Sequence, residues 1–326
     1  MGWFTSRGSK MTDSTDPNWE RDLITKLAHD ALIEQRRRRR WGIFFKLLTF
    51  AYITFVLLVM VDWSSRADLA GGKKHTALVE LNGIIAPGTD GSAERITTAL
   101  QAAFKDKNTQ GVVVRINSPG GSPVQAQTIY DEMRRLRKKY PEIPLYAVVE
   151  DICASGGYFV AAGADRIYVT KSSIVGSIGV LMNGFGFTGL MDKLGIDRRL
   201  ITAGENKGML DPFSPIAEKD KAYAQKLIDD VHQQFISVVR EGRGKRLKET
   251  PDMFSGLFWT GDKSVELGLA DGYGTLESVA RDVIKAEDII DYTQKEGIAE
   301  RVAKRFGAAA ASTLAEMALR SSPLLR

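Results

Sequence analysis

Two glycine-rich turns contain the side chains best suited to catalysis. Each follows an apolar run and leads into a helical pattern; they read Asn117-Ser118-Pro119-Gly120-Gly121-Ser122 and Ala154-Ser155-Gly156-Gly157-Tyr158. Paired glycines let a backbone pass close to a substrate and can leave N–H groups pointing at it, as a developing oxyanion requires. Ser155, beside Ala154 and two glycines, is open enough to act as a nucleophile.

Plainer interpretations of these turns stay open. Paired glycines after a strand often form an ordinary turn, and a serine at the start of a helix commonly caps it. Ser155 is therefore either a helix cap or a nucleophile. A phosphate-binding loop is disfavoured, because neither turn has the G-x-x-x-x-G-K-[ST] or G-x-G-x-x-G spacing.

A nucleophilic serine needs a base, and the sequence offers few. Of the three histidines, only His232 lies in the body of the chain, away from the N-terminal apolar segment. It falls within a helical pattern between Val231 and Phe235, where a packing or surface role is expected. This disfavours a Ser-His-Asp triad and leaves a lysine whose amine is kept neutral by burial. The residue pattern alone does not select that lysine.

Metal and cofactor chemistry is not indicated by the sequence. Cys153 is the only cysteine, so it forms neither an intrachain disulfide nor a cysteine-based zinc site, and the histidines are far apart. Cys153 precedes Ser155 by two residues and is an alternative nucleophile, although its place at the end of an apolar run predicts burial. We therefore expect no metal and no cofactor.

The elements around the turns alternate between strand and helix. Short runs rich in β-branched residues, typical of buried parallel strands, cover 76–85, 111–116, 145–149 and 166–169. Helical spacing covers 93–104, 123–139, 158–163 and 218–240. This alternation predicts an α/β sheet with right-handed crossovers, in which both turns lie at the carboxyl edge where ligands commonly bind.

An apolar segment at 41–61 is long enough to be a transmembrane helix. Its only charge is Lys46, and as a helix it would extend roughly 31 Å at ~1.5 Å per residue, which matches a bilayer core. Trp41 and Trp63 bracket it as interfacial aromatics do. A cleaved signal peptide is disfavoured because no small-residue cleavage site follows. We therefore expect a single uncleaved anchor.

Basic residues are concentrated before this anchor. Residues 1–46 hold ten Lys and Arg against six Asp and Glu, which leaves 35 against 34 in the rest of the chain. Direct nucleic-acid binding by the body is therefore disfavoured. Positive charge beside a first span is usually kept in the cytoplasm, so Arg36 to Arg40 predict a cytoplasmic tail over 1–40. After a linker at 62–75, the body would lie outside the cytoplasm.

Two further motifs follow the glycine-rich turns. They are Gly176-Ser177-Ile178-Gly179-Val180 and Asn206-Lys207 with its following Pro212. In this order and spacing, the four motifs resemble the signal peptide peptidase A family of Ser/Lys membrane proteases, in its half-length form with a single anchor. The resemblance implies a protease domain over 76–285 with the Clp protease and crotonase fold of repeated ββα units. Residues 286–326 would form a C-terminal helical extension.

The resemblance also implies roles for particular residues. Ser155 matches the nucleophile, Lys207 the general base, and Ser177 the serine that hydrogen-bonds the lysine amine. The backbone N–H groups of Gly121 and Gly156 are the candidates for the oxyanion hole. Which glycine of the first turn donates stays open.

The activity implied is that of a serine endopeptidase, anchored in a bacterial inner membrane with its catalytic domain on the periplasmic or extracytoplasmic side. Its substrates would be cleaved signal peptides and other hydrophobic peptides. The family also implies a homo-oligomeric ring, an octamer, whose active sites draw on neighbouring protomers beside the lipid bilayer. Phe185, Phe187 and Leu190 are candidates for an apolar substrate groove, with core packing as the alternative for at least one of them.

Two alternatives belong to other functional classes. A crotonase-type acyl-CoA enzyme would share the fold and the paired N–H groups, but acyl-CoA is cytoplasmic and an exported body would not meet it. A non-catalytic membrane scaffold on a protease fold would have no need of both Ser155 and Lys207, and the sequence has both.

Overall fold

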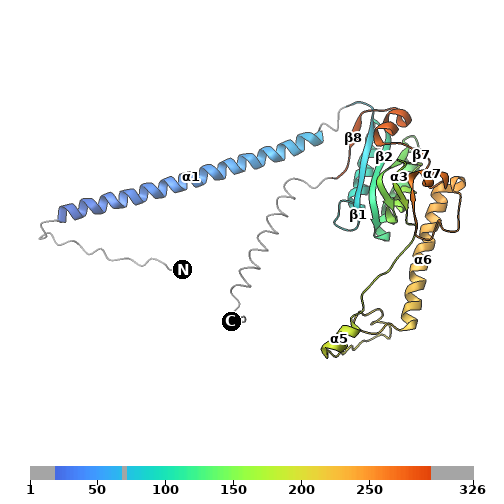
Figure 1. Cartoon of the computed structure of the whole chain (residues 1–326). Helices are drawn as coiled ribbons and strands as arrows, with labels where there is room; N and C mark the ends of the chain where they lie inside the picture. The colour runs from blue at the N-terminus through green and yellow to red at the C-terminus, as the bar shows by residue number, and fades with distance from the viewer. Residues whose placement is uncertain (1–18, 68–71, 295–326) are drawn as a thin grey trace. The chain divides into compact units, whose positions relative to one another are not determined.

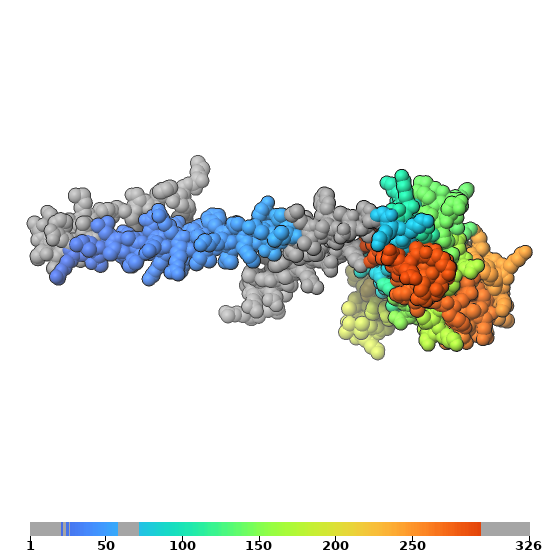
Figure 2. All heavy atoms as spheres, turned by 90° about the horizontal axis from the view of Figure 1, so that it is seen from above, coloured from blue at the N-terminus to red at the C-terminus, as the bar shows by residue number. Residues whose placement is uncertain are grey.

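The computed structural model describes residues 19–67 and 72–294, which fall into two compact units. The first unit contains α1 (Trp19–Ala67), one continuous helix of 49 residues. Its side chains between 27 and 57 are almost all exposed, and Figure 2 shows them in blue. By length and composition, the segment Leu27–Leu57 could cross a membrane.

This helix includes the expected anchor at 41–61 and fits a membrane-anchored protein. The helix also continues through the second half of the expected cytoplasmic tail. Residues 1–18 of that tail, residues 68–71 of the expected linker and the side chain of Trp63 lie outside the described part of the chain.

The second unit is built on an eight-stranded sheet with the order β6-β5-β3-β2-β1-β8, in which β4 pairs with β3 and β7. The strands are β1 (His75–Ile85), β2 (Thr109–Gly121), β3 (Leu145–Ala154), β4 (Arg166–Val169), β5 (Ile174–Gly176), β6 (Phe258–Thr260), β7 (Gly272–Tyr273) and β8 (Ile289–Asp291). All strand pairs are parallel except β5 with β6. The predicted α/β class is therefore confirmed.

Helices connect and cover the strands (Figure 1). They are α2 (Ala93–Lys105), α3 (Pro123–Lys139), α4 (Gly156–Ala161), α5 (Thr188–Leu194), α6 (Glu218–Arg243), α7 (Gly261–Glu266) and α8 (Leu276–Ser278), with the short η2 (Gly244–Arg246) and η3 (Val279–Ile284). α3 has the predicted bounds, because the Ser122 side chain caps its start by accepting from Gln125 N–H, and Pro123 fits the first helical position.

Both faces of the sheet are covered, which explains why β2 is a continuous apolar run. Val112, Val114 and Ile116 belong to the larger core, together with side chains of α2, α3 and α4. Val113 belongs to a smaller core on the opposite face, with Leu276 of α8. All four β2 side chains are fully buried. The sheet is thereby held rigid at the point where β2 and β3 end.

β8 corrects the expected domain boundary at 285. Residues 289–291 pair in parallel with 76–78 of β1 instead of starting the helical extension expected from 286. The physical reason is that Ile289 and Ile290 are β-branched and that β1 offers an edge for a further strand. The rest of the expected extension, from 295 onward, lies outside the described residues.

Residues 182–217, between β5 and α6, form a segment that we call the arm. No residue of the arm is buried. Its contacts include Phe187 stacked on Phe213, with ring centroids 5.5 Å apart, and an ion pair of 3.4 Å between Arg198 and Asp211. Figure 1 shows α5 of the arm at the end of α6 that lies away from the sheet.

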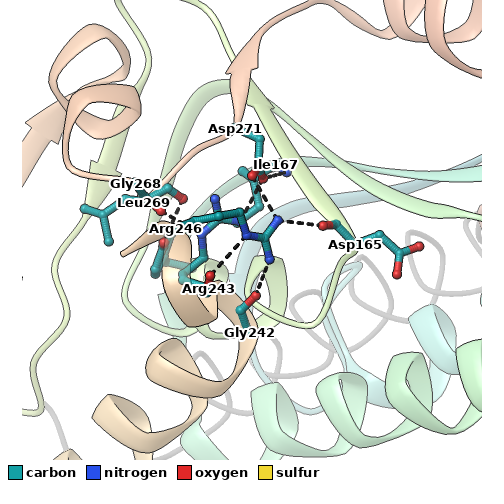
Figure 3. Close-up of polar contacts among 9 residues, drawn as sticks. Asp165, Ile167, Gly242, Arg243, Arg246, Gly268, Leu269 and Asp271 are labelled. Atoms are coloured by element: carbon teal, nitrogen blue, oxygen red, sulfur yellow. Dashed lines mark hydrogen bonds and ion pairs between the residues drawn. The ribbon is translucent and has the colours of Figure 1, made fainter. Parts of the chain in front are cut away.

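A buried ion pair fixes the other end of α6 to the part of the second unit that is built around the sheet, which we call the body (Figure 3). Arg243, whose side chain is fully buried, donates to the Asp271 carboxylate and to Gly268 O, each at 2.8 Å. Asp271 also accepts from Arg246 at 2.9 Å and from Ile167 N–H at 2.7 Å. Burial by itself raises a carboxyl pKa, but the hydrogen bond and charge of Arg243 outweigh it and hold the pKa of Asp271 below its ordinary value.

Candidate active site

A cavity of about 810 Å³ lies where β2, β3 and β5 end. This is the carboxyl edge of the parallel sheet, where the sequence predicted the two glycine-rich turns. Its lining includes four of the five predicted site residues, namely Gly121, Ser155, Gly156 and Ser177. Strands far apart in the sequence therefore bring these residues to one place.

Ser155 lies at the turn from β3 into α4 with φ 50° and ψ −123°. A positive φ is uncommon for a residue with a side chain, and such strain clusters at functional sites. The Ser155 N–H donates to Gly176 O at 2.9 Å, which holds the turn against β5. Its side chain makes no capping hydrogen bond to α4. The hydroxyl is therefore not a helix cap and is available to a ligand in the cavity.

The two glycine-rich turns meet backbone to backbone. A Cβ placed on Gly120 would lie 2.6 Å from Gly156 N, and one placed on Gly156 would lie 3.2 Å from Gly121 N. Gly120 also has a φ of 102°, which a side chain would strain. Its own N–H donates to Ser118 Oγ at 3.1 Å, whereas Gly121 lines the cavity. Gly121 is therefore the better placed of the two glycines to donate to a ligand.

Ser177 follows β5 and also has a positive φ, of 50°. Its N–H donates to Leu257 O at 2.8 Å. The next carbonyl, Ile178 O, lies 3.1 Å from Nε2 of His232, which joins this segment to α6 when Nε2 carries the proton. This contact gives the half-buried His232 a structural role, in line with the packing or surface role expected for it.

Lys207 is not brought to the cavity within a single chain. It is exposed on the arm, in a turn where its N–H donates to Gly204 O at 3.1 Å. The described residues that line the cavity do not include it. The structure of a single chain thus brings together Ser155, Ser177 and two glycines, and the contact of Lys207 with Ser155 stays a prediction.

Comparison with known proteins decides the family. The model of peptidase family S49 matches residues 137–289, and that of Clp protease matches residues 78–175. A putative protease of Methanocaldococcus jannaschii is 33% identical over 255 residues, which cover 74% of this chain and 81% of that protein. A putative signal peptide peptidase SppA of Enterococcus faecium is 30% identical over 235 residues, covering 69% and 68%. The chain belongs to peptidase family S49.

Family membership confirms the resemblance to signal peptide peptidase A and the Clp protease fold. A longer protein of Brucella abortus, named Na(+)/H(+) antiporter NhaA, is 43% identical over 209 residues. The match covers 63% of this chain and 28% of that protein. The chain thus spans less than a third of that relative, and the antiporter name describes the longer protein.

The walls of the S49 cavity include helical residues that the sequence analysis did not predict. They are Val124, Gln127 and Thr128 of α3, Phe159 of α4, and Val231, Gln234 and Phe235 of α6. Their three- and four-residue spacing places them on one face of α3 and one face of α6. That spacing is present in the sequence, but it does not indicate that the two faces line the same cavity.

The apolar residues expected to line a groove lie elsewhere. Phe185, Phe187 and Leu190 are on the arm, where they are 82%, 39% and 53% exposed. Within a single chain they neither belong to the core nor line the cavity. They are available for contacts with another molecule.

Cys153 is fully buried at the end of β3. Burial raises the pKa of its thiol far above the ordinary value, so the reactive thiolate is suppressed. This agrees with the predicted burial and separates Cys153 from the hydroxyl of Ser155 in the cavity. Among the described residues, no group of three His, Cys, Asp or Glu could hold a metal ion.

Proposed function

We propose that this S49 chain is a membrane-anchored serine endopeptidase with Ser155 as nucleophile and Lys207 as general base. The observation that carries the proposal is the conformation and place of Ser155. It has a positive φ, its side chain does not cap α4, and it lines a cavity that Gly121 and Gly156 also line. A hydroxyl placed beside backbone N–H groups in a cavity suits acyl transfer.

The proposed mechanism has two halves. Neutral Lys207 takes the Ser155 proton as Oγ attacks a peptide carbonyl, and the N–H groups of Gly121 and Gly156 stabilise the oxyanion. The protonated amine then gives its proton to the leaving nitrogen, the C–N bond breaks, and an acyl-enzyme ester remains. A water deprotonated by the same amine hydrolyses that ester. Ser177 orients the amine by a hydrogen bond.

In this proposal, Lys207 reaches Ser155 from a neighbouring protomer. The arm that carries Lys207 has no buried residue, and it presents apolar side chains such as Leu190 and Ile201, which are 53% and 95% exposed. Exposed apolar surface of this kind favours contact with another protein chain. A homo-oligomeric ring, an octamer, would bury the arm, complete each site and exclude folded proteins from it.

The proposed substrates are hydrophobic peptides, first of all the remnants of cleaved signal peptides. The apolar walls from Phe159, Val231 and Phe235 suit an apolar side chain next to the scissile bond. Arg36 to Arg40 before the apolar part of α1 favour a catalytic unit on the outer side of the inner membrane. Such an enzyme would meet these peptides at the membrane surface.

The proposal is tested on the full chain in detergent micelles. We expect a fluorophosphonate to label Ser155 and an internally quenched apolar peptide to be cleaved, with both signals lost in Ser155→Ala. Ser173→Ala, which removes a buried serine outside the cavity, serves as control and should keep both. A wild-type chain that neither labels nor cleaves would be a scaffold and not a peptidase.

A further inference from the structure

Ser118 has a place in the structure that the proposed mechanism does not use. It belongs to the first glycine-rich turn, and its side chain is fully buried. Its hydroxyl donates to Gly83 O at 2.6 Å and accepts from Gly120 N–H at 3.1 Å. A serine hydroxyl is both donor and acceptor, so this one group joins the ends of β1 and β2.

These two hydrogen bonds lie where the regular strand pairing is interrupted. The register of β1 against β2 shifts between Asn82 and Ile84, and that of β2 against β3 shifts between Ile116 and Ser118. Backbone groups at such irregularities lose their ladder partners and need others. Ser118 supplies a partner to each strand and so fixes Gly120 against β1.

Ser118 also packs against the second glycine-rich turn. A Cβ placed on Gly157 would lie 2.9 Å from Ser118 O and 3.4 Å from Ser118 Cβ. Ser118 therefore touches the residue after Gly156 while its hydroxyl holds the residue before Gly121. Gly121 and Gly156 are the two proposed oxyanion donors. Ser118 thus contacts the backbone beside each of them.

We propose that Ser118 is a positioning residue that sets the separation and direction of the two oxyanion N–H groups. The inference rests on the proposed function, because it presupposes that Gly121 and Gly156 stabilise an oxyanion. Such donors act when they are held in advance where the charge develops. A misplacement of about 1 Å can cost on the order of 10²-fold in rate. Loss of Ser118 therefore lowers kcat and leaves KM nearly unchanged.

Ser173 offers a matched control for this role. It is 1% exposed, and its hydroxyl donates to Glu150 O at 2.6 Å and accepts from Thr170 N–H at 3.1 Å. The Ser173 hydroxyl also lies 2.9 Å from the Thr170 hydroxyl. Ser173→Ala therefore deletes the same two kinds of hydrogen bond and this further contact at nearly the same burial, but outside the glycine-rich turns, and is the more severe of the two deletions. A general loss of stability affects both variants, whereas a loss of oxyanion positioning affects Ser118→Ala alone.

The experiment compares full-length wild type, Ser118→Ala and Ser173→Ala in detergent. Thermal unfolding, kcat and KM for an internally quenched peptide, and inhibition by a peptide aldehyde are measured for each. The aldehyde adds to Ser155 Oγ, and its oxygen then occupies the oxyanion position; the matching peptide amide cannot do this. We expect kcat of Ser118→Ala to fall about 10- to 100-fold with KM within about twofold. Aldehyde affinity falls similarly, and amide affinity does not.

The other outcomes separate a failure of the positioning role from a failure of the proposed function. An unchanged kcat in Ser118→Ala, or an equal loss in Ser173→Ala, overturns the positioning role and leaves the proposed peptidase standing. A wild-type chain without labelling or cleavage overturns the peptidase and this role together. If Ser118→Ala does not fold, Ser118→Cys replaces it, because sulfur keeps the shape but is a weak acceptor and donor. A lowered kcat supports the role, and a wild-type kcat overturns it.

Discussion

The body and the arm of the S49 unit differ in how closely their residues are packed. In the body, Ser155 is held by a backbone hydrogen bond to Gly176 and lies beside glycines that approach too closely to admit a side chain. In the arm, which carries Lys207, no residue is buried. One chain therefore holds the proposed nucleophile and the proposed oxyanion donors in a packed region and leaves the proposed base at its surface. In the proposed mechanism, the site is therefore completed only when protomers assemble.

The largest expected effect comes from the arm. Lys207→Arg keeps a permanent positive charge, so the side chain cannot accept the Ser155 proton, and we expect a loss of at least about 10⁴-fold in kcat. Peptide cleavage and thermal unfolding of the full chain measure the effect at unchanged stability. Lys193→Arg, an exposed lysine of α5 on the same arm, is the control and keeps activity. Wild-type cleavage by Lys207→Arg would remove Lys207 from the mechanism.

Mixing two inactive variants tests whether arm and body come from different protomers. Subunits of Ser155→Ala and Lys207→Arg are co-assembled, so that some sites combine an intact serine with an intact lysine. If the two residues meet between protomers, about a quarter of the sites are intact and activity returns to that level. No recovery in verified mixed assemblies would place both residues of the site in one protomer.

A smaller effect is expected within the body. Gly120→Ala places a Cβ 2.6 Å from Gly156 N, which obstructs the proposed oxyanion hole. We expect kcat to fall about 10²- to 10³-fold, as for loss of an oxyanion donor. Gly88→Ala is the control, because Gly88 also has a positive φ, of 76°, but has open space around its Cβ position. Equal losses in the two variants would attribute the effect to backbone strain.

The ion pair between Arg243 and Asp271, which holds α6 to the body, is expected to affect stability rather than chemistry. Arg243→Met removes the fully buried partner of the Asp271 carboxylate and leaves it Arg246 and Ile167 N–H, at a cost of about 3 kcal/mol in unfolding free energy. Arg240→Met, which breaks the exposed pair with Glu249, should cost about 1 kcal/mol or less. Denaturant unfolding of the full chain at pH 7 measures both. A cost for Arg243→Met no larger than that for Arg240→Met would show that the ion pair between Arg243 and Asp271 does not hold α6 in place.

The same ion pair predicts a pH dependence of stability. The pKa of Asp271 is lowered on folding, so its contribution is fully present above the unfolded pKa of about 3.9 and is lost as pH falls through the lower folded pKa. Wild type should therefore lose more unfolding free energy between pH 5 and pH 3 than Arg243→Met does. Equal losses would mean that Asp271 does not carry this dependence.

The smallest expected effect is at Cys153. Because its thiol is fully buried and its pKa is raised, thiol reagents should not inhibit the folded chain. Cys153→Ala should keep kcat within about twofold and lower stability by about 1 kcal/mol through a small cavity. Inhibition by a thiol reagent, or loss of cleavage at unchanged stability, would contradict the assignment of Ser155 as nucleophile.

The sequence by itself determined the alternation of strands and helices, the start of α3 at Pro123, and the two glycine-rich turns at the ends of β2 and β3. These features follow from local periods, caps and turn residues, which act within a few positions along the chain. The tertiary structure decided which distant segments come together. It brings Ser177 and Ser155 to one cavity, places the faces of α3 and α6 around it, and pairs β8 with the edge of β1. It also placed Lys207 outside that cavity within one chain, because contacts between distant segments depend on packing that no local pattern encodes.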